Sequence, residues 1–392
     1  MALLDYDLSG VFGPAAPREE FMKQTIIGAA IAAALAVGAV PSQAKELIYG
    51  SWMGANASTN AISLPHYFEK VKEATGGEIE WTLVPGGQLA TGAGTVDAVA
   101  GNLIDAGTTM APYTPRELPA TNAIFTRTVA GDDVVGTAGA MNELILLNCP
   151  ECKAEYERND AVAFGAYNTT PYLLMCKPEV STVADLSGTK VRASGGGVEI
   201  MKMAGATPVA MSPAEATSAL ERGVVDCVMG SLAWLRNYGY MDITEHVMEY
   251  PLGMAGPPLL MYMNRDVWND LTPEQRKAHI DNAAELVAVG TITAQMDIDA
   301  EVKAAALEEG VIFHEGGADF ADIMQQRVDQ QEAAIIEMAT SVGVDDVEGL
   351  LAKYSELLEK WADISGEVGT DVEKFTEALN REVYSKLDPE DL

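Results

Sequence analysis

The chain of 392 residues has little of what an active site or a metal centre requires. Its four histidines, His66, His246, His279 and His314, are scattered, without the spacing that metal-binding helices use. The sequence contains neither a Gly-x-Ser-x-Gly nucleophile elbow nor a P-loop. A triple glycine at 195–197 lacks the GxGxxG spacing of a dinucleotide site. We therefore expect a binding protein that uses no metal or other cofactor, rather than an enzyme.

Cysteine is also scarce, with four residues in the chain. Cys149 and Cys152 form a CxxC, while Cys176 and Cys227 stand alone. A zinc site usually needs a second pair with similar spacing, and the sequence has none. In an oxidising compartment we expect one or two structural disulfides. Their pairing stays open, with free buried thiols as the alternative.

Basic residues are few, and the formal net charge is −33 at pH 7. A field of this sign repels nucleic acid and anionic lipid, so we exclude both as partners. The long apolar run at 26–40 has roughly 15 residues, whereas a membrane-spanning helix needs about 20. We therefore do not expect an integral membrane protein.

That apolar run has the marks of a secretory signal peptide. Lys23 precedes it, and Ser42-Gln43-Ala44 ends it with small residues at the positions that a signal peptidase reads. We assign 1–44 to a signal peptide and expect the mature chain to begin near Lys45, in the periplasm. A retained membrane anchor is the alternative. Translation from Met22 would account for the acids and the proline of an unusual leader at 1–21.

After residue 44 the apolar pattern alternates between strand and helix periods, and the mature length favours two α/β domains. One helix of more than thirty residues is predicted over 273–309, from the capping box Thr272-Pro273-Glu274-Gln275 onward, with a kink expected at Gly290. Strands are predicted at 46–52, 78–84, 103–109, 162–167, 172–176, 189–193, 224–229 and 311–314, and further helices at 58–75, 95–101, 198–204, 213–221, 319–342, 347–365 and 372–387.

An ordered series of segments carries a family resemblance. It comprises Val-Ala-Asp-Leu-Ser-Gly-Thr-Lys-Val-Arg (183–192), Gly-Ala-Thr-Pro-Val (205–209), Ser-Pro-Ala-Glu (212–215) and Ala-Leu-Glu-Arg-Gly-Val-Val-Asp (219–226). The series resembles the extracytoplasmic solute receptors of TRAP (tripartite ATP-independent periplasmic) transporters, as do the strand Ile-Asp-Ala-Gly (104–107) and the long helix. The resemblance covers essentially the whole mature chain.

The resemblance implies an α/β, two-lobed periplasmic binding protein fold, with a ligand cleft between the lobes, hinge strands and a long bracing helix. It places 45–166 and 252–300 in lobe I. Lobe II then comprises 167–251 and 301–392, including the C-terminal helices.

The ligand anchor that the resemblance implies is Arg192, at the end of the strand 189–193. A guanidinium matches a carboxylate with two parallel charge-assisted hydrogen bonds. A surface or salt-bridged arginine is the alternative, and ordinary core packing is the alternative for the aromatic and methionine residues. Carried over by position, the other residues that face the pocket are Trp52, Met110, Asn168, Tyr172, Met211, Gly230 and Trp234.

The chain departs from the family pattern at two places. Many relatives carry a second arginine after the strand 162–167, where this chain reads Asn-Thr-Thr-Pro-Tyr (168–172). The usual Gly-Gln-Glu-Asn-Pro is replaced by Cys-Val-Met-Gly-Ser (227–231). A largely apolar wall with one arginine predicts a monocarboxylate with a hydrophobic or aromatic body.

As a TRAP receptor, the protein would capture a small organic acid and deliver it to the TRAP membrane subunits. Three other functions stay open: the binding protein of an ABC-type importer, a periplasmic sensory ligand-binding protein and a secreted enzyme with an unrecognised site. The sequence leaves open the ligand, the coupling ion and whether the protein forms a homodimer.

Overall fold

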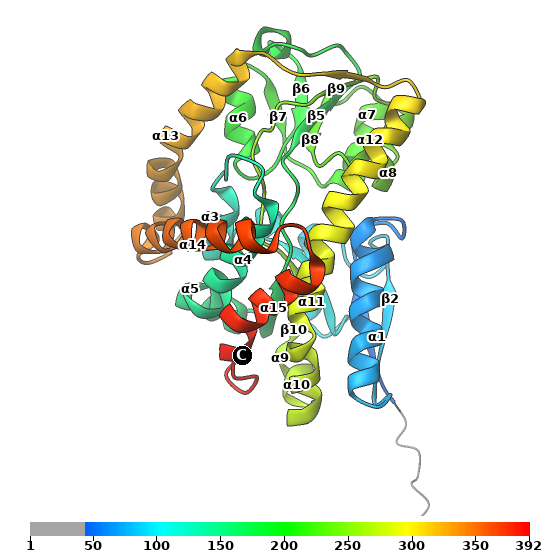
Figure 1. The fold of residues 1–392 in the computed structure, drawn as a ribbon, viewed down its shortest axis with the longest axis vertical. Helices are drawn as coiled ribbons and strands as arrows, with labels where there is room; N and C mark the ends of the chain where they lie inside the picture. The colour runs from blue at the N-terminus through cyan, green and yellow to red at the C-terminus, as the bar shows by residue number, and fades with distance from the viewer. Residues whose placement is uncertain (1–43) are drawn as a thin grey trace, which may run out of the picture. The chain divides into compact units, whose positions relative to one another are not determined.

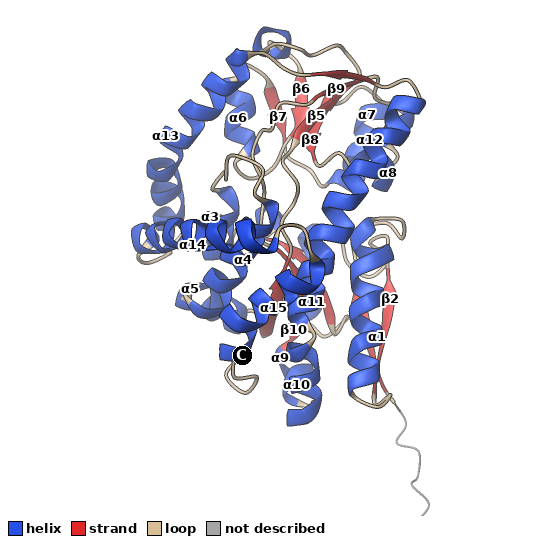
Figure 2. Ribbon diagram, in the orientation of Figure 1, coloured by secondary structure: helices blue, strands red, loops and turns tan. Residues whose placement is uncertain are grey.

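The computed structural model describes residues 44–392, so the predicted signal peptide, apart from Ala44, lies outside the described residues. The described part folds into two lobes, each built on a mixed sheet with helices against it (Figure 1, Figure 2). Over residues 44–392, no helix combines the length and the apolar character that crossing a bilayer requires.

The first sheet has the strand order β2-β1-β3-β10-β4. Strand β1 pairs in parallel with β2 and β3, and β10 runs antiparallel between β3 and β4. The polar–apolar alternation of 78–84 is realised in β2, where Ile79 and Trp81 are buried. The bounds are β1 Lys45–Gly50, β2 Ile79–Val84, β3 Ala106–Met110, β4 Ala161–Ala166 and β10 Pro258–Asn264.

The second sheet has the order β11-β9-β5-β8-β6-β7, with β5 antiparallel to both of its neighbours. Each sheet therefore contains one antiparallel strand, β10 or β5, that enters after the chain crosses from the other lobe. The crossing strands add to the plain α/β alternation expected from the sequence. The bounds are β5 Leu173–Cys176, β6 Lys190–Arg192, β7 Thr207–Val209, β8 Cys227–Gly230, β9 His246–Met248 and β11 Ile312–His314.

The shorter helices pack against the sheets or against one another. They are α1 Leu64–Ala74, α2 Thr95–Ala100, α3 Pro119–Thr126, α4 Val134–Leu147, α5 Pro150–Arg158, α6 Gly197–Met203, α7 Pro213–Glu221, α8 Trp234–Asn237 and α9 Arg265–Asn269. A π-helical turn, Thr59–Ser63, leads into α1, and 3₁₀ turns lie at Gly92–Gly94, Ala111–Tyr113, Val183–Leu186, Tyr240–Asp242 and Tyr384–Lys386. The capping box at Ser212 is confirmed, because Ser212 and Glu215 exchange backbone and side-chain hydrogen bonds at the start of α7.

The predicted long helix occupies the expected residues but is not one uniform α-helix. It runs as α10 (Pro273–Asp281), α11 (Ala283–Ala288), a π-helical stretch (Val289–Asp297) and α12 (Ile298–Glu308). Gly290 lies in the π-helical stretch, where a Cβ atom would approach Leu260 to 3.3 Å. Close contact with β10 accounts for the glycine. The helix contributes Leu286 to the core of the first lobe and Val302 to that of the second.

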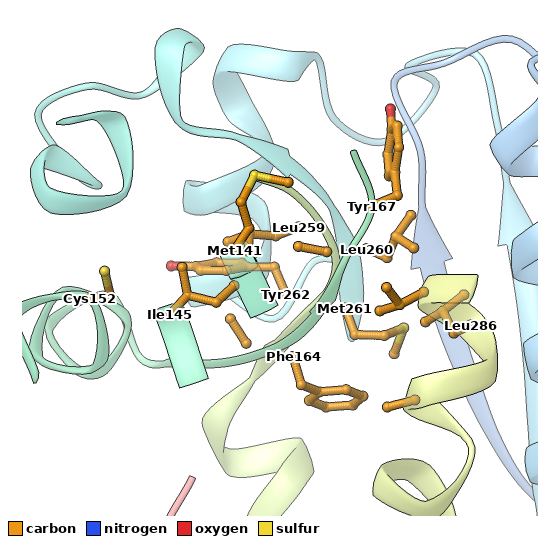
Figure 3. Close-up of a cluster of buried hydrophobic side chains, with 14 of the residues drawn as sticks. Met141, Ile145, Cys152, Phe164, Tyr167, Leu259, Leu260, Met261, Tyr262 and Leu286 are labelled. Carbon is orange, nitrogen blue, oxygen red and sulfur yellow. The ribbon is translucent and has the colours of Figure 1, made fainter. Parts of the chain in front are cut away.

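The core of the first lobe forms around β10, whose residues are all buried. Figure 3 shows Leu259, Met261 and Tyr262 from this strand among Phe164 of β4 and Leu286 of α11. Burial on both faces explains why these strands read as nearly continuous apolar runs.

The C-terminal helices extend the same core. They are α14 (Val347–Val368) and α15 (Val372–Glu382), and Trp361 of α14 packs so closely on α4 that a Cβ at Gly139 would lie 2.0 Å from its ring. The resemblance implies that 301–392 belongs to lobe II, but Trp361 and Phe375 bury their rings in the core of the first lobe. Helix α13 (Ala318–Ser341) reaches both cores, with Phe320 in the second and Ile335 in the first.

The two disulfides pair Cys149 with Cys152 and Cys176 with Cys227. The expectation of structural disulfides is thus confirmed, and the pairing that the sequence left open is resolved. Cys176 and Cys227 are opposite each other on the antiparallel strands β5 and β8. In the region 44–392, no histidine, cysteine and carboxylate side chains come together as a group that could hold a metal ion.

Candidate functional site

A cleft of about 850 Å³ lies beside the strand ends of both lobes. Trp52 and Tyr113 line it from the first lobe, and Ser194 and Met211 from the second. Helix α13 closes a further side. The remaining lining residues include Gly86, Gly87, Thr91, Gly92, Asn122, Thr126, Val198, Glu199, Ala214, Glu215, Arg327, Ala334, Ile335 and Met338.

Arg192 is the last residue of β6, and its exposed fraction is 0%. It does not line the cleft itself, but Tyr113, Ser194 and Met211, which it contacts, do. The guanidinium donates from Nε to the Met211 carbonyl (2.8 Å) and from Nη1 to the Met229 carbonyl (3.2 Å). Nη2 lies 3.1 Å from the Tyr113 hydroxyl oxygen and 3.4 Å from Ser194 Oγ. All four acceptors are neutral.

Arg192 forms no ion pair with any carboxylate of residues 44–392, in contrast to Arg236, Arg265, Arg276 and Arg381. Burying a cation without a counter-charge is unfavourable, and neutral hydrogen bonds offset that cost only in part. The electrostatics of the site therefore favour the entry of an anion.

Tyr113 links Arg192 to the open part of the cleft. Burial raises the pKa of the Tyr113 hydroxyl, and the neighbouring Arg192 charge opposes that shift only in part. The hydroxyl therefore stays protonated while its oxygen accepts from Arg192. The Tyr113 ring packs edge-on against Trp52, with the ring centres 5.6 Å apart.

Trp234 covers Arg192 from the second lobe. Its ring centre lies 5.1 Å from the guanidinium carbon and 5.4 Å from the centre of the Tyr172 ring. Gly230 makes this packing possible, because a Cβ at position 230 would lie 2.0 Å from the Trp234 ring. Arg192, Tyr172, Gly230 and Trp234 thus form one contiguous group, although none of the four lines the cleft itself.

Of the other predicted residues, some line the cleft and others are buried behind it. Trp52 and Met211 line the cleft, whereas Met110 is buried in the same apolar cluster as Trp52 and Tyr172. Asn168 is fully buried, and its amide donates to the Val134 carbonyl at 3.3 Å. Asn168 therefore packs against the start of α4 and does not line the cleft.

Several buried polar atoms on segments that follow the strands make no hydrogen bond with the described residues. They include Thr109 Oγ1, Asn168 Oδ1 and Ser231 Oγ, at or after the ends of β3, β4 and β8. Buried polar atoms normally have a partner, so these three atoms are exceptions to the usual hydrogen bonding of a protein interior.

Sequence reasoning missed two residues of this region. Tyr113 follows the end of β3, and a position just after a strand was the one signal that could have identified it. Arg327 of α13 lines the cleft with an exposed fraction of 3% and donates to the Thr126 carbonyl at 2.8 Å. No local motif distinguishes Arg327, because its burial results from the docking of α13.

The fold is shared with solved TRAP solute-binding proteins. A protein from Rhodoferax ferrireducens in complex with copurified benzoate is 21% identical, with a TM-score of 0.73 over 82% of this chain and 99% of that one. A marine metagenome protein specific for aromatic acid ligands, in complex with 3-hydroxybenzoate, is 24% identical, with a TM-score of 0.71 over 82% and 99%. A Bordetella pertussis receptor binding pyroglutamic acid is 18% identical, with a TM-score of 0.69 over 80% and 100%.

The sequence also matches a family model described as bacterial extracellular solute-binding protein, family 7, over residues 52–336. This match spans every strand of the two sheets except β1, together with Arg192 and the long helix. The chain therefore belongs to the bacterial extracellular solute-binding protein family 7, which confirms the resemblance found in its sequence.

Proposed function

We propose that this protein is the periplasmic receptor of a TRAP transporter, that it binds a small organic acid through Arg192 and that it delivers the acid to the membrane subunits. The observation that carries this proposal is the state of Arg192, a fully buried guanidinium beside the cleft with only neutral hydrogen-bond acceptors. A ligand carboxylate is the counter-charge that such a site lacks.

The carboxylate would interact with the Nη2 side of Arg192, where the partners are hydroxyl groups rather than backbone carbonyls. The Tyr113 hydroxyl can turn its proton toward the incoming oxygen, because it only accepts from Arg192. Hydrogen bonds to charged groups contribute about 1.5–3 kcal/mol each, more than neutral ones. The bonds from Nε and Nη1 meanwhile hold the guanidinium in a fixed orientation.

The walls favour an acid with a flat, apolar body. Tyr113 and Trp234 contact Arg192 directly, and Trp52, whose ring packs on Tyr113, lines the cleft with Met211. Proteins of the same fold bind benzoate and 3-hydroxybenzoate, which fits this class of ligand. Pyroglutamic acid, bound by the Bordetella pertussis receptor, is the competing candidate. The Trp52 and Tyr113 rings in the cleft lining support the aromatic acid.

Capture needs contacts that both lobes make with the ligand only when the cleft is closed. The chain crosses between the lobes at 167–172 and 249–257, and the long helix contributes to both cores. These segments are where a hinge would act. The proposed role is binding and release, without turnover of the acid.

A thermal-shift screen of residues 45–392 tests this proposal. The panel comprises benzoate, 3-hydroxybenzoate, pyroglutamate and succinate, and the variants are Arg192→Ala and, as a control in the same lobe, the exposed Arg222→Ala. A ligand at 100 times its Kd stabilises the folded state by about 2.7 kcal/mol. We expect aromatic acids to raise the Tm of the wild type and of the Arg222 variant, but not that of the Arg192 variant. A response to succinate alone would exclude the monocarboxylate, and an unchanged Arg192→Ala response would exclude the anchor.

Delivery to the transporter is tested separately by uptake of the identified acid into cells that express the receptor with TRAP membrane subunits. Uptake that persists without the subunits, or that requires an ATP-binding subunit instead, would favour an ABC-type importer. An acid that binds but is never transported would favour a sensory protein.

A further inference from the structure

Asp299 of α12 connects the long helix to two segments that carry the aromatic wall. Its Oδ2 accepts a hydrogen bond from Thr170 Oγ1 at 2.5 Å. Its Oδ1 accepts one from the backbone N–H of Ala233 at 2.6 Å. One carboxylate thus joins the long helix, the crossing segment 167–172 and the start of α8.

Both partners adjoin aromatic residues of the site. Thr170 precedes Tyr172 by two positions in the crossing segment, and Ala233 directly precedes Trp234. The Tyr172 and Trp234 rings pack with their centres 5.4 Å apart, and Trp234 covers Arg192. A shift of either backbone segment would therefore move a ring that lies next to the anchor.

The environment of Asp299 is unusual for a carboxylate on a long helix. It forms no ion pair with a basic side chain of residues 44–392, although Arg236 and Glu301 form one between α8 and α12 at 3.2 Å. Burial raises the pKa of Asp299 to about 6, and the bonds from Thr170 and Ala233 oppose this rise. A partly buried carboxylate that accepts hydrogen bonds from two separate segments can hold those segments in place, which an exposed helix residue cannot do.

We propose that Asp299 is a positioning residue for the ligand site, which fixes Tyr172 and Trp234 relative to Arg192 and so sets the preference for acids with a ring. This inference rests on the proposed function for its ligand class. Its structural part, the fixing of the two segments by one carboxylate, does not depend on any ligand.

The binding test compares Asp299→Asn with Asp297→Asn. Asp297 is exposed, ends the π-helical stretch just before α12, and its side chain caps no backbone group. Calorimetric titrations use benzoate as the ring-bearing acid and propionate as an acid without a ring. We expect Asp299→Asn to weaken benzoate binding roughly tenfold and propionate binding less than twofold, because the loss of a charged acceptor loosens the wall and leaves Arg192 in place. Asp297→Asn should bind both acids as the wild type does. An equal loss for both acids would overturn the preference role.

A second measurement decides the structural part without a ligand. Amide hydrogen exchange of the wild type, Asp299→Asn and Thr170→Val should show faster exchange at 232–237 in the Asp299 variant, and at 167–172 in both variants. Unchanged exchange at both segments would overturn the positioning role even if every variant folds. If the wild type binds neither acid, the proposed function fails while the exchange data still decide the role of Asp299.

Discussion

The Arg192 guanidinium lies 5.1 Å from the ring centre of Trp234, and a glycine at position 230 provides the space for that ring. A cation and an aromatic face attract each other, most strongly where water is excluded. The ring therefore stabilises the buried charge from one side without neutralising it, and the need for an anion on the other side remains.

Replacing Gly230 by alanine tests this arrangement. The added Cβ would lie 2.0 Å from the Trp234 ring, so the ring must move or the strand must shift. We expect a loss of about 1–3 kcal/mol in the free energy of unfolding, typical of overpacking, together with weaker binding of aromatic acids. Gly366→Ala in α14 is the control, because a Cβ there meets nothing within 4 Å. Denaturant unfolding that leaves Gly230→Ala as stable as the wild type would contradict the close packing.

Tyr113→Phe removes the hydroxyl that accepts from Arg192 and faces the cleft. We expect acid binding to weaken roughly tenfold, because a hydrogen bond to a charged group is lost. Tyr238→Phe is a suitable control from the same apolar cluster, since its ring packs on Trp234 without contacting Arg192 Nη2. Calorimetry that gives equal affinities for Tyr113→Phe and the wild type would remove Tyr113 from the site.

The burial of His279 leads us to expect that the folded protein loses stability in acid. Its Nδ1 donates to the Gln275 carbonyl at 2.8 Å, and its Nε2 accepts from Trp81 Nε1 at 3.2 Å, so the buried ring is neutral. Burial lowers the pKa of His279 to about 4 from the ordinary 6.5. The unfolded chain therefore binds a proton first as the pH falls, and the stability present above pH 6.5 is lost down to about pH 4.

Urea unfolding of the wild type and His279→Gln between pH 7 and pH 4 measures this effect. The stability advantage of the wild type should shrink by roughly 3 kcal/mol over that range, since one pKa unit corresponds to about 1.4 kcal/mol. The same titration of His66→Gln, at a partly exposed histidine, controls for other groups. A pH-independent difference between the wild type and His279→Gln would contradict the neutral buried ring.

The two disulfides should differ in their effect on stability. The bond between Cys176 and Cys227 closes a loop across 51 positions, whereas Cys149 and Cys152 are three apart. A disulfide lowers the entropy of the unfolded chain, and the effect grows with the length of the loop that it closes. We therefore expect the free energy of unfolding to fall by about 2–4 kcal/mol in the double variant Cys176→Ala, Cys227→Ala. The loss should be clearly smaller in the double variant Cys149→Ala, Cys152→Ala. Thermal unfolding of the two double variants provides the comparison, and the reverse order would contradict the prediction.

The sequence predicted those parts of the fold that local chemistry determines. The alternation of polar and apolar residues over 78–84 predicted β2. The capping boxes at Ser212 and Thr272 predicted where α7 and α10 begin. Helices α3, α4 and α5 were missed. In α4, Val134 to Ile145 is buried on every side, which removes the amphipathic period on which the prediction depended.

The candidate site was only partly predictable, for a similar reason. Arg192 lies in an ordered family motif and at a strand end, so sequence position alone makes it the predicted anchor. Arg327 and Asp299 reach the region through the docking of helices that are distant in sequence. The assignment of α14 to the second lobe failed in the same way, because the surface that receives Trp361 is formed by α4.

The central claim is that Arg192 binds the carboxylate of an acid ligand, and calorimetric titration of benzoate into the wild type, Arg192→Lys and Arg222→Lys tests it most directly. Lysine keeps the charge but loses the planar fork, so we predict that Arg192→Lys binds at least about tenfold more weakly while Arg222→Lys binds as the wild type does. Equal affinity of Arg192→Lys and the wild type would contradict the account, because the carboxylate would then bind elsewhere.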